Sequence, residues 1–303
     1  MPTLFAHDHT PAELRALTGS LAQVAGIRLL EYAEGRVRGM RVADVYTGSG
    51  FRFHVLLDRA CDVGMAEFAG KPLAWLHPAL GTPDRYEPAG YGWARTFGGG
   101  LVTTCGLTHF GQPEADGDEA FGLHGRISHT PAEKVKITEE WRGEDYVLEI
   151  ESQVRQSVLA GENLLLIRKI STRLGANHLV IEDIVRNEGG RSTPHMILYH
   201  CNFGFPVVSP DSELRLNAES VTPRDENARR GLENYSRFER PDANFMEQVF
   251  FHKLRTDANG YASAAIINRA LDFGAFIHYR SNELPYFGQW KQLGMTDYVC
   301  ALE

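Results

Sequence analysis

Cysteine is scarce in this chain of 303 residues. The four cysteines, Cys61, Cys105, Cys201 and Cys300, are widely spaced and form no C-x-x-C pair. This spacing excludes a compact zinc or redox motif, so we expect the cysteines to be small apolar fillers in a reducing compartment.

Long apolar runs and an excess of positive charge are also missing. Runs such as Leu164–Ile167 are far shorter than the roughly 20 residues of a membrane helix. The N-terminal segment lacks the basic and then apolar pattern of a secretory signal. Lysine and arginine total 31 against 39 acidic residues, and no basic run could neutralise a phosphate backbone. We therefore expect a cytoplasmic protein that binds neither membrane nor nucleic acid.

Helical periodicity is almost absent, with one exception near the N-terminus. Thr10 is a good capping residue, Pro11 suits the first helical position, and Glu13 completes a capping box. This pattern predicts a short helix that ends near Gly19. With 43% hydrophobic and 23% charged residues, the chain has the composition of an ordinary globular protein with a substantial core.

Short runs rich in β-branched and aromatic residues occupy most of the remaining sequence. They lie at residues 26–32, 37–46, 51–57, 135–141, 146–154, 164–172, 179–185, 196–201, 213–216, 248–254, 261–267 and 275–279. Phe51, Phe53, Val55 and Leu57 alternate strictly, as in a strand with one buried face. Because no helices separate these runs, we predict an all-β fold, a large antiparallel β-sandwich that forms one domain over residues 1–303.

Two stretches interrupt the strand pattern. Residues 72–133 contain many prolines and glycines and show little alternation, and residues 220–245 are polar and charged. A long irregular region inside a compact domain is usually functional or disordered. We interpret the second stretch as a surface excursion.

Three polar segments are candidates for chemistry. His124 and Arg126 lie beside two glycines, which let the main chain approach a ligand closely. His200 and Asn202 lie near a predicted strand end and would share a face, although a buried histidine bonded to a carbonyl is an equal alternative. Glu303 ends an apolar run, and the pattern alone favours a solvated carboxylate over a paired one.

Charged and aromatic residues add further candidates. Asp58, Arg59 and Asp62 close a predicted strand. A surface ion pair explains them, and Arg59 could equally bind an anionic or hydroxyl-rich ligand. Most aromatic residues at strand spacing belong to the core, and we except only Trp75 and Trp290.

These segments together resemble a known superfamily. The L-H-G motif at 123–125, the strand ending H-x-x-F at 200–203 and the terminal L-E at 302–303 look like those of the aldose 1-epimerase (galactose mutarotase-like) superfamily, whose fold is a large antiparallel β-sandwich. More narrowly, residues 57–59, 99–107, 123–126 and 198–204 are similar to a bacterial branch of uncharacterised function, DUF4432. The similarity covers nearly the whole chain.

The resemblance implies a function and a catalytic set. His124 and His200 would contact a sugar, and Glu303 would be the catalytic base. Glu303 would remove the C1 hydroxyl proton while His200 protonates the ring oxygen, so that the ring opens and closes again as the other anomer. His124 would orient or polarise the ring oxygen. This chemistry requires no cofactor and no metal, and the sequence leaves the oligomeric state open, with a homodimer as one option.

Further residues are predicted to bind the substrate. Asn202 and Trp290 belong to this set. The superfamily usually carries a substrate-binding aspartate between the second histidine and the glutamate, and Asp225 is our candidate, with Asp242 as the other nearby aspartate.

Arg59 and Arg126 complete the predicted substrate-binding set. Neither has a necessary role with a neutral sugar, so they predict an anionic substituent such as a phosphate, sulfonate or uronic carboxylate. Related chains continue beyond the glutamate into further strand, so we expect the natural chain to extend past Glu303.

Two other functions compete with this interpretation. A sugar-binding protein without catalytic activity could use the same fold. A metal-dependent sugar isomerase could use His54, His109, His124 or His129 with Glu119, although their spacing matches no compact ligand motif.

Overall fold

The computed structural model describes residues 1–303, which divide into two compact units. The first unit comprises residues 1–70, 78–98 and 103–198, and the second comprises residues 71–77, 99–102 and 199–303. Each unit is assembled from three separate segments of the chain. That residues 1–303 form a single domain stays a prediction. No helix in either unit is long and apolar enough to cross a membrane.

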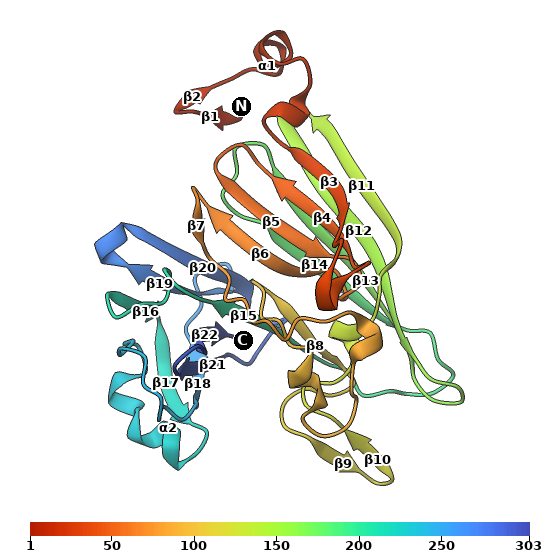
Figure 1. The fold of residues 1–303 in the computed structure, drawn as a ribbon, viewed down its shortest axis with the longest axis vertical. Helices are drawn as coiled ribbons and strands as arrows, with labels where there is room; N and C mark the ends of the chain where they lie inside the picture. The colour runs from red at the N-terminus through yellow and green to blue at the C-terminus, as the bar shows by residue number, and fades with distance from the viewer. The chain divides into compact units, whose positions relative to one another are not determined.

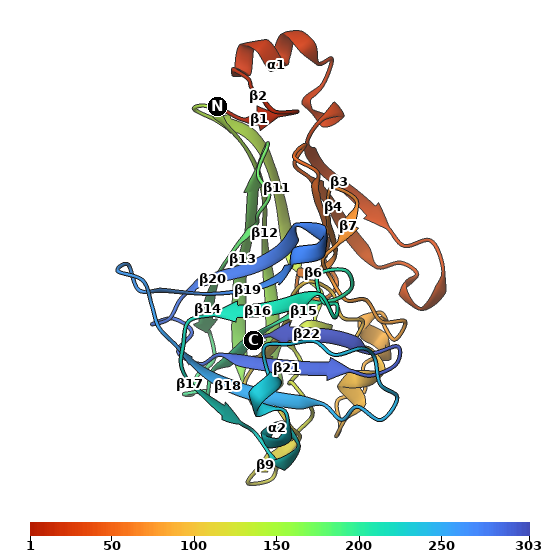
Figure 2. The same ribbon diagram turned by 90° about the vertical axis from the view of Figure 1, so that its left-hand side faces the viewer.

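Two antiparallel sheets build most of the first unit. They have the orders β3-β4-β5-β6 and β11-β12-β13-β14, and Figures 1 and 2 show them as two facing layers. Their strands are β3 (Gly26–Glu31), β4 (Arg41–Tyr46), β5 (Phe51–Leu56), β6 (Asp62–Phe68), β11 (Glu133–Arg142), β12 (Asp145–Ser157), β13 (Asn163–Arg173) and β14 (Val180–Asn187). The predicted mostly β, antiparallel architecture is confirmed.

The smaller elements of the first unit lie before, between and after these strands. They are β1 (Thr3–Leu4), β2 (His7–Asp8), α1 (Pro11–Leu17), β8 (Thr103–Leu107), β9 (Glu114–Asp116), β10 (Glu119–Phe121) and the 3₁₀ turns Leu21–Gln23, Gly35–Val37, Pro83–Arg85, Gly92–Arg95 and Ile127–His129. In α1 the Glu13 backbone N–H donates to Thr10 Oγ1 and the Thr10 backbone N–H donates to the Glu13 carboxylate, so the predicted capping box is confirmed.

The second unit contains two more antiparallel sheets. One has the order β17-β18-β21-β22-β15, as Figure 2 shows, and the other has the order β16-β19-β20. Only the residues of β15 from position 199 onward belong to this unit. The elements are β7 (Lys71–Pro72), β15 (Met196–Phe203), β16 (Ser212–Leu216), β17 (Ala218–Pro223), α2 (Glu226–Arg230), β18 (Gln248–Leu254), β19 (Tyr261–Asn268), β20 (Phe273–Arg280), β21 (Gly288–Leu293), β22 (Tyr298–Leu302) and the 3₁₀ turns Leu232–Asn234 and Arg269–Leu271.

The strand pattern was accurate where one face is buried. Phe51, Phe53 and Val55 are buried while Arg52 and His54 between them are only half-buried, as the alternation in β5 predicts. Other boundaries were wrong. The run at 37–46 starts with a 3₁₀ turn and becomes a strand only at residue 41, after a glycine with positive φ. The stretch at 72–133 contains β8, and the excursion at 220–245 contains α2.

The segment Asp58–Asp62 corrects the expected surface ion pair. Asp58 does pair with Arg41, but Arg59 and Asp62 are buried, with only 2% and 3% of their surface exposed. The Arg59 Nη1 group donates to two backbone carbonyls, while Asp62 accepts from the buried Arg168 guanidinium. A carboxylate can be buried here because it receives charge-assisted bonds, which the sequence pattern does not reveal.

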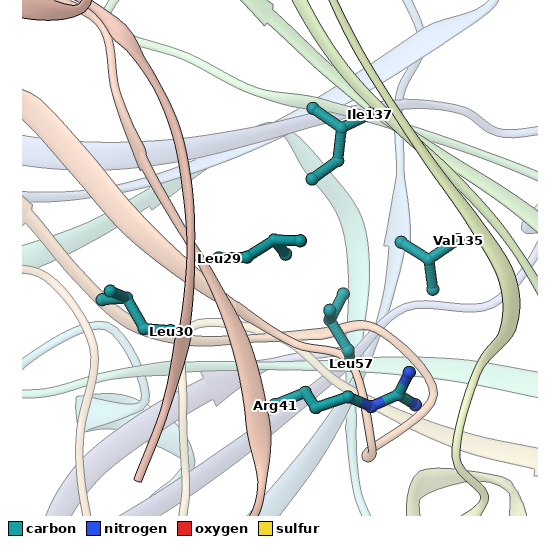
Figure 3. Close-up of a pocket in the computed structure, with 6 residues that line it drawn as sticks. All are labelled: Leu29, Leu30, Arg41, Leu57, Val135 and Ile137. Atoms are coloured by element: carbon teal, nitrogen blue, oxygen red, sulfur yellow. The ribbon is translucent and has the colours of Figure 1, made fainter.

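An apolar groove opens in the first unit between β3 and β11 (Figure 3). Its lining consists of Leu29, Leu30, Arg41, Leu57, Val135 and Ile137. Arg41 is the only charged lining residue, and Asp58 neutralises it at 2.5 Å. The lining supplies no acid and base for chemistry on a polar ligand.

Candidate functional site

An imidazole and a carboxylate are paired in the second unit. His200 lies on β15 and Glu303 follows β22, its neighbour in the sheet. Cys201 pairs with Leu302, so the next position of the ladder places His200 opposite Glu303. His200 Nε2 lies 2.9 Å from Glu303 Oε1. The expectation from pattern that this carboxylate is solvated was therefore wrong, because its side chain is only 12% exposed and is paired.

The backbone of Glu303 is fixed as firmly as its side chain. Its N–H donates to the Gly288 carbonyl at 2.9 Å, and its carbonyl accepts from the Gly288 N–H at 2.8 Å. Gly288 in turn pairs with Phe251 on β18, so the register places a residue without a side chain between Phe251 and Glu303. Phe251 and Glu303 therefore lie on the same face of the sheet, on either side of this glycine.

Trp290 lies on the same face and packs against the pair. Trp290 and Asn202 both pair with Ala301. Asn202 lies two residues from His200 on β15, and Ala301 lies two residues from Glu303. Because alternate residues of a strand share a face, all four side chains lie on one side of the sheet. The Trp290 and His200 rings meet edge to face, with their centroids 5.5 Å apart. Sequence analysis correctly singled out Trp290 as an aromatic residue outside the closed core, since it is only half-buried.

A chain of charged groups orients the Trp290 indole. Trp290 Nε1 donates to Glu247 Oε2 at 2.8 Å, and Arg224 donates to the other oxygen of Glu247 at 2.9 Å. Arg224 also donates to Asp225 at 2.9 Å. Asp225 caps α2, and the backbone N–H of Ala228 lowers its pKa. The predicted substrate-binding aspartate is thus a helix cap that reaches Trp290 only through two other side chains.

Asn202 fastens two short segments to β15. Its Nδ2 donates to the carbonyls of Gly100 and His200, and its backbone carbonyl accepts from Trp75 N–H. Asn202 is completely buried, and its Oδ1 atom has no hydrogen-bond partner. Trp75 then lies edge-on to Trp290 at 6.5 Å. Asn202 therefore holds the segments at Trp75 and Gly100 against β15, and its Oδ1 atom accepts no hydrogen bond.

The L-H-G loop (Leu123–Gly125) lies in the first unit. His124 adopts a positive φ of 58°, which few residues other than glycine accept. Gly125 also has a positive φ, and a Cβ atom on it would lie 2.4 Å from the carbonyl oxygens of Gly106 and His109. The glycines predicted to allow a close backbone approach are used for that purpose, but the approach is to the protein's own chain.

The two predicted arginines have different environments in this unit. Arg126 is exposed, and its backbone N–H donates to the Gly106 carbonyl. Arg59 is buried, and its Nη1 group donates to the carbonyls of Gly81 and Thr96 at 3.0 Å each. Burial lowers the pKa of Arg59 to about 10, which still leaves it charged at neutral pH. Binding of an anionic substituent by both arginines stays a prediction.

The predicted residues thus fall into two groups. His200, Glu303, Asn202 and Trp290 are gathered on one sheet face in the second unit, where Asp225 is linked to Trp290. The other predicted residues, His124, Arg126 and Arg59, belong to the first unit.

A family model for a domain of unknown function, DUF4432, matches residues 37–303. The chain belongs to the DUF4432 family. A search of curated proteins found no match to it. Among solved structures, this DUF4432 protein is similar to a Klebsiella pneumoniae protein provisionally named an aldose 1-epimerase, with 24% identity and a TM-score of 0.86 over 91% of this chain and 73% of that one.

Two more distant structures share the fold. A galactose mutarotase-like protein from Clostridium acetobutylicum has 14% identity and a TM-score of 0.61 over 92% of this chain and 88% of that one. The protein Slr1438 from Synechocystis has 13% identity and a TM-score of 0.53 over 84% of this chain and 81% of that one. The DUF4432 chain therefore has the galactose mutarotase-like fold expected from its motifs.

Sequence analysis of this DUF4432 protein missed the residues that support the site. Glu247 and Arg224 carry no motif, because each lies directly beside the end of a strand and no spacing pattern connects them. Trp93 was assigned to the core and is buried, yet its ring lies 4.7 Å from that of His124. Only the spatial arrangement connects these residues to the candidates, so no periodicity could have identified them.

Proposed function

We propose that this protein is an aldose 1-epimerase type enzyme that interconverts the anomers of a sugar by acid and base ring opening. The observation that carries the proposal is the His200–Glu303 pair at 2.9 Å on a sheet face lined by Trp290. The likeness of the fold to galactose mutarotase-like proteins supports it.

The spacing of the pair suits this reaction. The C1 hydroxyl oxygen and the ring oxygen of a sugar are bonded to the same carbon, so a base and an acid acting on them must be neighbours. Glu303 accepts the C1 hydroxyl proton, and His200 donates a proton to the ring oxygen as the bond from C1 to that oxygen breaks. Rotation about the bond between C1 and C2 and reversal of both transfers close the other anomer.

The remaining predicted residues have supporting roles in the proposal. Trp290 offers an aromatic face to the C–H groups of the sugar, and the buried Asn202 acts on the substrate indirectly, by holding the His200 backbone and the segment at Gly100. Asp225 acts on the substrate through Arg224 and Glu247, and a contact of His124 with a sugar stays a prediction from its motif. An anionic substituent, if bound, would use Arg126, since the Arg59 Nη1 group already bonds two carbonyls.

Anomer exchange measured by NMR or polarimetry on purified protein with a panel of neutral and anionic sugars tests the proposal. Glu303→Gln keeps the shape but removes the base, so we expect the exchange rate to fall by about 10²–10⁴-fold with binding retained. Glu283→Gln changes an exposed glutamate of the same unit and is the control. Binding of a sugar with no acceleration of exchange by the wild type would instead support a binding protein.

The same assay tests the predicted anionic substituent. We expect Arg126→Ala to weaken binding of the anionic sugars selectively, because a guanidinium recognises a phosphate, sulfonate or carboxylate. Equal effects on neutral and anionic sugars would contradict that part of the proposal.

A further inference from the structure

Four buried side chains beneath the L-H-G loop form a closed ring of hydrogen bonds. Trp93 Nε1 donates to Ser128 Oγ at 3.0 Å, and Ser128 Oγ lies 3.2 Å from His129 Nδ1. His129 Nε2 lies 2.7 Å from Thr96 Oγ1, and Thr96 Oγ1 donates to the Trp93 carbonyl at 3.3 Å. The ring therefore starts and ends on Trp93.

An arrangement of protons with a neutral imidazole gives every bond of this ring one donor and one acceptor. The Trp93 indole N–H can only donate and the Trp93 carbonyl can only accept. When Thr96 donates to the Trp93 carbonyl, it accepts the proton on His129 Nε2, and the Ser128 hydroxyl, which accepts from Trp93, donates to His129 Nδ1. In this arrangement the imidazole is neutral, and a second proton on Nδ1 would require the Ser128 hydroxyl proton to turn away from the ring.

The ring contacts the L-H-G loop by two routes. The Trp93 indole lies against the His124 imidazole, with the centroids 4.7 Å apart. Tyr86 stacks on His129 at 4.0 Å, and its hydroxyl donates to the Gly125 carbonyl at 2.9 Å. The loop is thus held both at the His124 side chain and at the next peptide group.

His124 needs support of this kind. A non-glycine residue with positive φ costs free energy and persists only where the surroundings enforce it. Loop residues that lack such support populate several conformations, whereas a group that acts on a reacting atom must be held within a fraction of an ångström.

We propose that the ring of Trp93, Ser128, His129 and Thr96 positions His124, and that Arg59 contributes through this ring and not by touching the substrate. Arg59 Nη1 donates to the carbonyl of Thr96, the residue whose hydroxyl closes the ring. The role in catalysis rests on the proposed function, whereas the positioning of the imidazole does not.

Two mild variants test the inference without removing a buried charge. Ser128→Ala opens the ring, and Tyr86→Phe removes the bond to the loop while leaving the stacking surface. Tyr91→Phe is the matched control, because Tyr91 is exposed and its hydroxyl bonds only Gln112. The ring ¹⁵N resonances of His124, assigned with His124→Asn, are followed through a pH titration, and anomer exchange gives kcat and KM.

We expect both test variants to shift the His124 ring resonances and titration midpoint, and to lower kcat about tenfold with KM nearly unchanged. Tyr91→Phe should behave as wild type. Wild-type His124 resonances in both Ser128→Ala and Tyr86→Phe would overturn the inference. If the wild type accelerates no anomer exchange, the proposed function fails, while the resonances still decide whether the ring positions His124.

Discussion

Acidification should destabilise this protein through His129. Burial, with a smaller contribution from the nearby Arg59 charge, lowers the pKa of His129 from 6.5 to about 2, so the folded chain keeps this imidazole neutral. In the unfolded chain the same imidazole takes up a proton below about pH 6.5. The unfolded state therefore binds more protons between about pH 6.5 and about pH 2, and stability is lost as the pH falls through that window.

The size of the effect follows from these two pKa values. Between pH 7 and pH 5 the unfolded imidazole changes from mostly neutral to almost fully protonated, while the native imidazole remains neutral. The resulting loss in the free energy of unfolding is about 2 kcal/mol. The loss has a structural cause, since the imidazole is buried and a second proton on it would turn the Ser128 hydroxyl proton out of the ring.

Urea unfolding at pH 7 and pH 5, followed by tryptophan fluorescence, measures this loss in the wild type and in His129→Gln. The variant removes the titrating group, so its stability should depend on pH less steeply by about 2 kcal/mol over this interval. Other groups, such as His252, whose burial lowers its pKa to about 4, act in both proteins and cancel in the comparison. An identical pH dependence would show that native His129 accepts a proton, which would refute the closed ring.

Three further perturbations have defined outcomes. A double-mutant cycle of Glu247→Ala and Trp290→Phe should give a coupling of about 1 kcal/mol in urea unfolding, reduced by the partial exposure of the carboxylate, and a coupling near zero would contradict the bond. Arg168→Met should cost about 3–5 kcal/mol in the same assay, since it strands two buried carboxylates, and a neutral effect would contradict their ionisation. Gly122→Ala should cost about 1–3 kcal/mol, because its Cβ would meet a carbonyl oxygen at 2.1 Å; unchanged stability would show that the loop can shift.

The sequence was informative wherever burial repeats with a fixed period. Alternation identified β5 and the long strands of the first unit, and the capping residues around Thr10 identified α1. The strands β6 and β17 were missed because β6 begins with a buried aspartate and contains glycine, and β17 is short and mostly polar. A search for alternating apolar residues does not detect a strand whose buried positions hold polar groups, because those groups are satisfied by partners far away in the sequence.

The residues of the candidate site were predicted from family motifs and not from hydrophobic periodicity or charge pattern. Pattern alone favoured a solvated Glu303, and only the resemblance suggested that it works with His200. Their contact depends on the pairing of two strands about a hundred residues apart, which no local signal specifies. The hydrogen bond that orients Trp290 was missed for the same reason. The role of Glu247 follows only from its position beside the Trp290 indole, whose N–H donates to its carboxylate.

The ladder that joins β15 to β22 has a consequence for how such a protein can diversify. The separation of His200 and Glu303 is set by the spacing of neighbouring strands, and the backbone of Glu303 is locked to Gly288 on its other side. Loops at the rim can therefore lengthen, shorten or change composition without disturbing the distance between the two side chains. Under the proposed function, evolution could exchange one sugar for another at the periphery while the His200–Glu303 pair is inherited unaltered as part of the sheet itself.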